Sequence, residues 1–380
     1  MSGQHKDYVA GLDGLRAASV SMVILGHLGL GDLIPGGMGV TIFFFISGFL
    51  ITRLLWAERD RNDNLDLLRF YGRRTLRLLP EMLVLLLVLT LIAGPLLNQP
   101  MQPLQALAGL TYWTNYYIIS GLGHCDHCAV TGHLWSLAVE EHFYLVMPLA
   151  LLLCGFVPRR LAVLFLVVIV AAAAWRSFAF TVLHVSEIYT YKATECRIDS
   201  IAWGCLAAVM ERAWPAAMAF IKRRAWLVFG AGAALMLASL AYRDPIFRET
   251  LRYSVQGLAL IGIILPLVVA PRLSGVVKLL EIAPLRWMGR RSYAAYLWHM
   301  LALTLAGGIV GFSGVIETAS RATQLQALPY ALGLSWIFAE LSYRFVYTPA
   351  QRLKPWVTAG RTVEANAARI PPDRAAEAVS

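Results

Sequence analysis

Long runs of apolar residues alternate with short polar segments along most of the 380-residue chain. Residues 83–97 are mostly Leu, Val and Ile, and residues 161–175 are equally apolar. About 20 apolar residues suffice to cross a bilayer as an α-helix. The pattern predicts ten spans, near residues 10–30, 36–56, 78–97, 133–154, 160–180, 197–211, 225–242, 252–270, 292–311 and 327–347. We therefore expect an all-α fold, a polytopic membrane helix bundle of about ten transmembrane helices.

The segments between the predicted spans are too short to form a separate soluble domain. The longest, residues 98–132, has an apolar middle (residues 104–119) that could dip into the membrane interface. Residues 1–356 are accordingly predicted to form one transmembrane domain. Residues 357–380 are rich in Ala, Arg, Glu and Pro, a composition that predicts a disordered tail.

Composition supports this fold class. Apolar residues make up 58% of the chain and charged residues only 15%, and the mean hydropathy is +0.61. Soluble domains usually contain about 45–50% apolar residues. The composition therefore excludes an ordinary soluble globular protein.

The net charge of +10 raises the question of a nucleic-acid partner, but the positions of the cations argue against one. Of the 33 Lys and Arg residues, 25 fall in the segments that lie inside if the N-terminus is cytoplasmic, and five fall outside. Cytoplasmic loops of membrane proteins carry such an excess of Lys and Arg. We therefore expect a multi-pass protein of the inner (plasma) membrane with both termini cytoplasmic, and no nucleic-acid partner.

The first span carries an unusual pair of polar residues, Arg16 and His27. Eleven residues of α-helix correspond to about 16 Å of rise and about 20° of net rotation, so the two side chains share one face. Asp13 lies three residues before Arg16, near the same face. A structural Arg–Asp pair with an interfacial histidine is one interpretation. Because ionisable groups within membranes usually face a bundle interior or a wet cavity, a functional site is the other.

Further polar groups within the predicted spans favour the functional interpretation. His133, Glu140 and Tyr144 lie near one face of the fourth span, at offsets of seven and four residues. The other groups are Arg197 and Asp199 at the start of the sixth span, His299 in the ninth, and Arg73, Arg74 and Arg77 at the mouth of the third. Together they predict a polar cavity with a cationic inner entrance and a histidine at its outer end.

Such a cavity suits chemistry across a membrane. Arginines would hold a phosphate-bearing donor, because the forked guanidinium matches phosphate. A neutral His27 could take a proton from an attacking hydroxyl, and Glu140 could orient it or stabilise the imidazolium. A contact between His27 and Glu140 is a hypothesis that the sequence alone cannot test.

These residues resemble those of the acyltransferase-3 family of integral membrane acyltransferases, which includes bacterial O-acetylases of surface polysaccharides. The resemblance extends from about Tyr8 to Trp356. The motifs occur in the family's order: GLDGLRA…H, GGMGVTIFFFISGFLIT, FYGRRTLRLLP, HLWSLAVEEHFYL, RIDSIAWG, SYAAYLWH and SYRFVYTPAQR.

The resemblance implies transfer of an acetyl or short acyl group from acyl-CoA to a carbohydrate hydroxyl of a surface polysaccharide or glycolipid. It implies no permanently bound cofactor, acyl-CoA being the donor substrate. It also implies that His27 is catalytic with Arg16 as its motif partner, that Arg74 and Arg77 contact donor phosphates, and that Glu140 is the active-site carboxylate. Two positions depart from the family pattern: His142 replaces a usual Gln, and Tyr347 replaces a usual acid.

Two alternative functions share the same spans and buried charges. A glycan or lipid transporter predicts no dependence on CoA, and a non-catalytic component of a polysaccharide-synthesis complex predicts that loss of His27 is harmless. The cysteines also allow two interpretations. Cys125 and Cys128 have the spacing of zinc ligands, but an outer loop favours a disulfide among Cys125, Cys128 and Cys196, so no metal is predicted.

Overall fold

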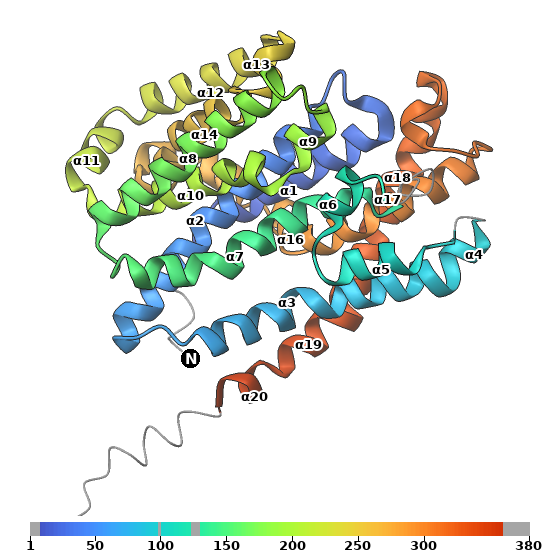
Figure 1. Ribbon diagram of the computed structural model, residues 1–380, viewed down its shortest axis with the longest axis horizontal. Helices are drawn as coiled ribbons and strands as arrows, with labels where there is room; N and C mark the ends of the chain where they lie inside the picture. Colours follow the sequence, from blue (N-terminus) through green and yellow to red (C-terminus); the bar gives the residue numbers. More distant parts are fainter. Residues whose placement is uncertain (1–7, 98–99, 123–129, 360–380) are drawn as a thin grey trace, which may run out of the picture.

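The computed structural model describes residues 8–97, 100–122 and 130–359, and all secondary structure within these ranges is helical (Figure 1). The predicted all-α fold is therefore confirmed. The α-helices are α1 (Leu12–Leu25), α2 (Gly36–Asn62), α3 (Leu67–Val88), α4 (Gly94–Leu96), α5 (Pro103–Leu110), α6 (Thr114–Ile119), α7 (Trp135–Leu153), α8 (Pro158–Thr181), α9 (Glu187–Lys192), α10 (Thr194–Ala213), α11 (Pro215–Arg223), α12 (Ala225–Ala241), α13 (Pro245–Glu249), α14 (Arg252–Val269), α15 (Ser274–Leu280), α16 (Ala283–Arg290), α17 (Ser292–Ile309), α18 (Arg321–Ser342), α19 (Thr348–Arg352) and α20 (Lys354–Ala359).

Short π-helical and 3₁₀ turns extend or link these helices. The π-helical turns are η1 (Gly26–Leu30), η2 (Leu89–Ala93) and η7 (Tyr343–Tyr347), and the 3₁₀ turns are η4 (Gly132–Leu134), η5 (Pro271–Leu273) and η6 (Ile316–Thr318). Of the predicted disordered tail, residues 357–359 belong to helix α20, and residues 360–380 lie outside the described residues. The apolar stretch at residues 104–119 forms α5 and α6, which are too short to cross a membrane.

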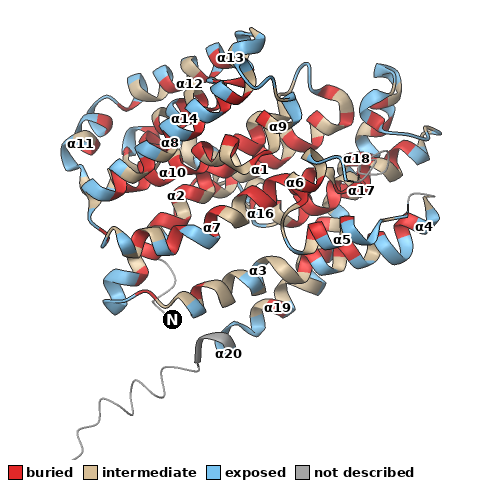
Figure 2. Ribbon diagram, in the orientation of Figure 1, coloured by how far each residue is buried: buried red, intermediate tan, exposed pale blue. Residues whose placement is uncertain are grey.

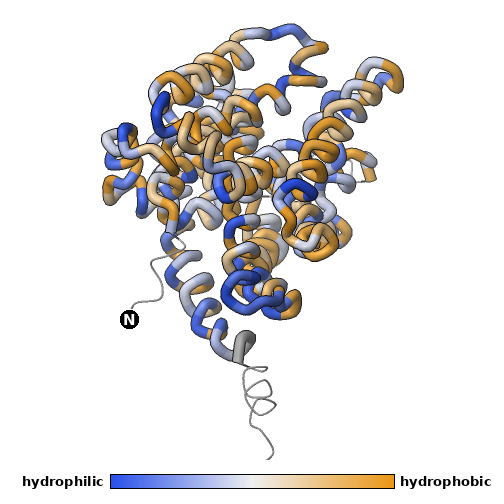
Figure 3. Tube along the Cα trace, turned by 90° about the vertical axis from the view of Figure 1, so that its left-hand side faces the viewer, coloured by the Kyte–Doolittle hydropathy of each residue, from blue (hydrophilic) through white to orange (hydrophobic). Residues whose placement is uncertain are grey.

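Within the described ranges, five helical segments are long and apolar enough to span a membrane by length and composition: Gly36–Asn62, Leu67–Leu96, Gly132–Leu153, Pro158–Thr181 and Arg252–Val269. A sixth candidate is the pair α11 and α12, which meet at 90°. The other four predicted spans correspond to α1, α10, α17 and α18. These helices are shorter or carry more polar and charged residues. The protein is a polytopic membrane bundle, and hydrophobic residues dominate its long helices (Figure 3).

Helices α2 and α10 pack together with unusually close backbones, and buried residues concentrate around them (Figure 2). A Cβ atom on Gly48 would lie 2.0 Å from the carbonyl oxygen of Ile201, and one on Gly204 would lie 2.0 Å from that of Phe45. Small residues allow membrane helices to approach closely. The two glycines therefore set the spacing of the central helix pair.

Glycines also allow helix α1 to pack closely against α15 and α16. A Cβ on Gly14 would lie 2.2 Å from the carbonyl oxygen of Leu280, and one on Gly289 would lie 2.0 Å from that of Asp13. This packing places Asp13 and Arg16 beside Arg290 and Ser292 at the junction of α16 and α17. One end of α1 is thereby fixed next to a cluster of charged groups.

A fully buried ion pair joins α8, α10 and α14. The Arg176 Nη2 lies 3.0 Å from Asp199 Oδ2, and the Ser254 hydroxyl donates to the same oxygen at 2.7 Å. Arg176 also donates to the carbonyl of Thr250 at 2.6 Å. Burying charges is tolerated when each is paired and hydrogen-bonded, as here. The predicted cavity residue Asp199 thus has a structural position.

The glycine contacts give a stability prediction. Gly204→Ala should lower the free energy of unfolding by about 1–3 kcal/mol, because its methyl group must push α2 and α10 apart. Gly230→Ala in α12 is the matched control, since its Cβ meets nothing within 4 Å and alanine favours the helix. Thermal unfolding of both purified variants in detergent would test this. An unchanged midpoint for Gly204→Ala would contradict it.

Candidate active site

A cavity of about 550 Å³ lies at the end of α1, where the helix passes into the π-helical turn η1. We call it the histidine cavity. Its wall includes His27, His133, Trp135, Tyr191, Lys192 and Glu317. The turn around His27 departs from regular helix, with Gly29 at a φ of 98°. Such π-helical insertions are frequent at functional sites.

Three histidines meet beside this cavity. His27 Nδ1 lies 3.1 Å from His299 Nε2, and the two rings stack with centroids 5.2 Å apart. The His133 and His299 ring centroids lie 4.8 Å apart, with the rings nearly perpendicular. His299 is fully buried and His27 is partly exposed. The histidine nearest to solvent is therefore oriented by a second one behind it.

The hydrogen bonds determine which His27 nitrogen carries a lone pair. His299 Nδ1 lies 2.6 Å from the carbonyl oxygen of Tyr296, which can only accept, so Nδ1 carries the proton. Nε2 of a neutral His299 then accepts, and His27 Nδ1 must donate to it. In neutral His27 this leaves Nε2 with an unshared pair, as a general base or a nucleophile requires.

His133 is fixed by the same logic but lacks a second partner. Its Nε2 lies 3.1 Å from the Leu297 carbonyl and therefore donates to it. Its Nδ1 is left as a buried acceptor with no hydrogen-bond partner. His133 is 3% exposed, and its side chain lines the histidine cavity. A ligand in this cavity could supply the missing donor.

A second cavity, of about 220 Å³, lies near the other end of α1. We call it the arginine cavity, and its charged wall residues are Asp13, Arg16, Arg77, Glu81 and Arg290. Arg16 Nε donates to Ser292 Oγ at 3.3 Å, and Arg290 lies 3.8 Å from Asp13. Among the described residues Arg77 has no hydrogen bond or ion pair. An exposed guanidinium without a partner is available to an anionic ligand.

A small central pocket of about 50 Å³ lies between the two cavities. Arg16 and Tyr293 belong to both its wall and that of the arginine cavity, and Val40 and Tyr296 belong to both its wall and that of the histidine cavity. The three spaces therefore form one series through the bundle. Tyr296 thus forms part of the partition between the central pocket and the histidine cavity. Its hydroxyl donates a hydrogen bond to the His133 carbonyl at 2.7 Å.

Glu140 lines this central pocket rather than the histidine cavity. It accepts hydrogen bonds from Ser47 and, at 2.9 Å, from Tyr144 one helical turn away. The predicted common face of Glu140 and Tyr144 is therefore present. No hydrogen bond joins Glu140 to His27 in the described structure, so the hypothesised contact between them is not formed.

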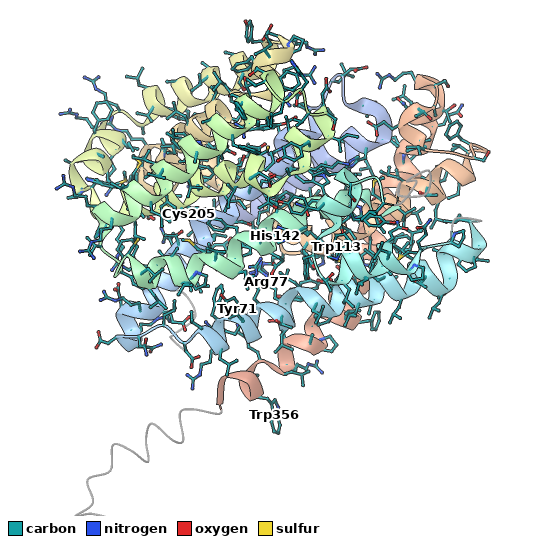
Figure 4. The ribbon with its side chains drawn as sticks, in the orientation of Figure 1. Tyr71, Arg77, Trp113, His142, Cys205 and Trp356 are labelled. Atoms are coloured by element: carbon teal, nitrogen blue, oxygen red, sulfur yellow. The ribbon has the colours of Figure 1, made fainter. Side chains whose placement is uncertain are left out.

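The structure separates the three arginines of the basic cluster. Arg73 forms an ion pair with Glu58, and Arg74 forms one with Glu141 at 2.6 Å. The Arg74 guanidinium also lies 3.1 Å from the centre of the Tyr144 ring. Neither Arg73 nor Arg74 lines the arginine cavity. Of the three arginines, Arg77 alone belongs to its wall. Figure 4 labels Arg77 on α3.

Arg197 and Asp199 are buried structural groups rather than cavity residues. Arg197 lies 3.7 Å from the centre of the Tyr253 ring and donates to Thr41 at 3.2 Å. Asp199 pairs with Arg176. Sequence reasoning also missed wall residues of the central pocket, including Ser47, Ser136, Tyr293 and Tyr296. The three-residue spacing of Tyr293, Tyr296 and His299 was the available signal, because it places them near one helical face.

The cysteine predictions can be followed only in part. Cys125 and Cys128 lie outside the described residues. Cys154, Cys196 and Cys205 form no disulfide within the described ranges, and Cys196 is buried. No group of three or more His, Cys, Asp or Glu side chains suited to a metal ion occurs in those ranges.

Comparison with known proteins identifies the family of the chain. The family model of the acyltransferase-3 family, described as an acyltransferase domain, matches residues 9–340. The chain belongs to the acyltransferase-3 family. No solved structure gives a significant match.

Curated relatives of this acyltransferase-3 chain include O-acetyltransferase OatA of Staphylococcus aureus (strain NCTC 8325 / PS 47), 33% identical over 369 residues. Peptidoglycan O-acetyltransferase OatA of Listeria monocytogenes is 29% identical over 365 residues. The matches cover 91% of this chain but only 57% and 56% of these relatives, so the chain spans little more than half their length.

The two departures from the family pattern occupy different surroundings. His142 is labelled in Figure 4; its Nδ1 lies 2.7 Å from the Thr194 hydroxyl, and its ring stacks on that of Tyr116. It lines none of the three spaces. Tyr347 lines the arginine cavity and stacks on Tyr343. The acyltransferase-3 chain thus has an aromatic hydroxyl at this position in the cavity.

The hydrogen-bond direction gives a prediction independent of activity. In protein with ¹⁵N-labelled histidine, His27 Nδ1 should give the signal of a protonated nitrogen and Nε2 that of an unprotonated one at a pH where the ring is neutral. His299→Phe should remove this preference and yield a mixture of tautomers. A protonated Nε2 in the unmodified protein would contradict the assigned direction.

Proposed function

We propose that this protein is a membrane O-acyltransferase that moves an acetyl or short acyl group from acyl-CoA to a carbohydrate hydroxyl. The observation that carries the proposal is the series of three spaces. It joins an arginine cavity with an unpartnered Arg77 to a histidine cavity where His27 Nε2 has a free lone pair. Family membership and the O-acetyltransferase relatives support the reaction type.

The donor would enter from the arginine cavity. The forked guanidinium groups of Arg77 and Arg16 suit the phosphates of CoA. Arg290 also lines the arginine cavity and adds a third positive charge to its wall. Arg16 and His27 are separated by about 16 Å along α1, a gap that suits a donor with a long, thin arm ending in the thioester. If the donor enters there, the arginine cavity faces the cytoplasm, in agreement with the Lys and Arg bias of the loops.

Acyl transfer would occur at His27. As a general base, Nε2 takes the proton of the acceptor hydroxyl while its oxygen attacks the thioester carbon, the C–S bond breaks, and the proton passes to the departing CoA thiolate. As a nucleophile, the same nitrogen would carry the acyl group transiently. Both routes need the lone pair on Nε2. Both routes also gain from His299. Its Nε2 accepts the hydrogen bond from His27 Nδ1 and so stabilises the positive charge that develops on His27.

The acceptor would be a surface polysaccharide or glycolipid reached from the histidine cavity. The Listeria relative is named a peptidoglycan O-acetyltransferase, which places cell-wall glycan among the acceptors to test. A glycan exporter is less compatible with the structure, because the central pocket of about 50 Å³ is far smaller than a ligand site for a molecule of that size.

The test of the function uses proton NMR of purified surface glycans, searching for base-labile O-acetyl signals. The strains are the intact host, a deletion, and the deletion complemented with the wild type, His27→Ala or His142→Gln at matched membrane levels. We expect deletion to remove the signals, and His27→Ala to restore less than about 1% of them, since loss of a general base costs about 10²–10⁴-fold in rate. His142→Gln should restore them, because His142 lines none of the three spaces.

Restoration of O-acetyl signals by His27→Ala would remove the proposed role of that histidine. Signals that survive the deletion would redirect the search to other glycosides and strengthen the transporter alternative.

The donor site gives a separate prediction. Arg77→Ala should raise the KM for acetyl-CoA about tenfold or more, because a charge-assisted phosphate contact contributes about 1.5–3 kcal/mol. Arg160→Ala removes an exposed cation at the start of α8 and should leave this KM unchanged. Initial rates of transfer from radiolabelled acetyl-CoA in proteoliposomes would measure both. Equal KM values for Arg77→Ala and the wild type would exclude Arg77 from the donor site.

A further inference from the structure

The histidine cavity contains a cation with no counter-ion. Lys192, the last residue of α9, lines the cavity, and no hydrogen bond or ion pair involves its ammonium group among the described residues. Burial of the side chain lowers the pKa of Lys192 below its ordinary value. A half-buried ammonium without a partner is costly unless a ligand supplies the opposite charge.

Among the described residues, the only carboxylate in the wall of this cavity belongs to Glu317. Glu317 forms no ion pair with Lys192 within the described structure, so it does not compensate the ammonium. The two charges instead mark different parts of the wall. An anionic group would bind at Lys192, whereas the Glu317 carboxylate would accept hydrogen bonds from hydroxyl groups.

Two neighbouring features also fit a ligand. His133 Nδ1 is a buried acceptor without a partner, so it needs a donor such as a hydroxyl. Trp135 and Tyr191, with ring centroids 4.9 Å apart, are aromatic residues of the same wall. A pyranose ring offers both hydroxyl donors and C–H faces. The cavity volume of about 550 Å³ lies within the usual range for ligand sites.

The position of Lys192 relates it to the reacting group. Its ammonium is close enough to interact electrostatically with the His27 ring. An anion held at Lys192 would neutralise a positive charge that otherwise opposes formation of imidazolium at His27. The ligand that satisfies Lys192 is therefore also one that helps the proposed reaction.

We propose that the histidine cavity selects an acidic carbohydrate, binding its carboxylate or phosphate at Lys192 and one of its hydroxyls at His133 Nδ1. This inference rests on the proposed function, because it specifies the acceptor of that reaction. Lys192 is then the specificity-determining residue, and His133 recognises a group that acidic and neutral sugars share.

The test measures binding without any acyl donor. Purified protein in nanodiscs is titrated with methyl glucoside, methyl glucuronide and methyl glucoside 6-phosphate, and dissociation constants are obtained by ligand-observed NMR. We expect at least one acidic glycoside to bind about tenfold more tightly than the neutral one, the effect of one charge-assisted contact of about 1.4 kcal/mol. The carboxylate and phosphate arms identify which anion the site prefers.

Matched variants separate charge recognition from folding. Lys192→Met should abolish the preference for the acid while changing the affinity for methyl glucoside less than twofold, and Lys192→Arg should retain it. Arg243→Met, which removes an exposed cation outside the cavity, should behave as the wild type. His133→Phe should weaken all three glycosides alike.

Equal binding of neutral and acidic glycosides by the wild type, or no measurable binding of any, would overturn the proposal. An equal loss for all ligands in Lys192→Met would also overturn it, because that pattern indicates a structural role. Failure of acyl transfer alone would remove the proposed function, yet an acid preference that depends on Lys192 would still stand in this assay. The two failures can therefore be told apart.

Discussion

The cost of placing a charge inside a membrane organises this structure. Each such charge must be paired, hydrogen-bonded or open to a polar space. Most are paired between helices: Arg176 with Asp199, Arg74 with Glu141, and Arg291 with Glu340. These pairs fix how the helices sit against one another. Arg77 and Lys192, which form no ion pair among the described residues, line cavities at opposite ends of the series. The same rule thus separates architectural charges from those available to ligands.

The histidine cluster extends this rule to a neutral group. A single backbone carbonyl, that of Tyr296, determines the proton position on His299 and through it on His27. Because the carbonyl belongs to α17, the direction of the hydrogen bonds is built into the helix rather than into a flexible loop. The π-helical turn after α1 then presents the free nitrogen at the cavity. The tautomer of His27 is therefore specified by main-chain geometry.

Sequence patterns predicted the features that depend on one helix at a time. Apolar runs gave the helix bundle, and residue spacing gave the common face of Glu140 and Tyr144. Spacing could not show which helices meet. It therefore could not assign Arg73 to Glu58, could not show that Glu140 pairs with Ser47 instead of His27, and did not identify Lys192. The same limit applies to Arg197, whose surroundings come from α2, α9 and α14.

The partition formed by Tyr296 has a bioenergetic consequence. A passage that moves an acyl group across an energised membrane must not become a pathway for protons. The Tyr296 hydroxyl is held by the His133 carbonyl and the Ser136 hydroxyl, and its ring is buried between the two neighbouring spaces. The Tyr296 side chain thus belongs to the wall that the two spaces share. In the proposed reaction, which joins a donor and an acceptor from opposite sides of the membrane, this partition would oppose the flow of protons between the two spaces.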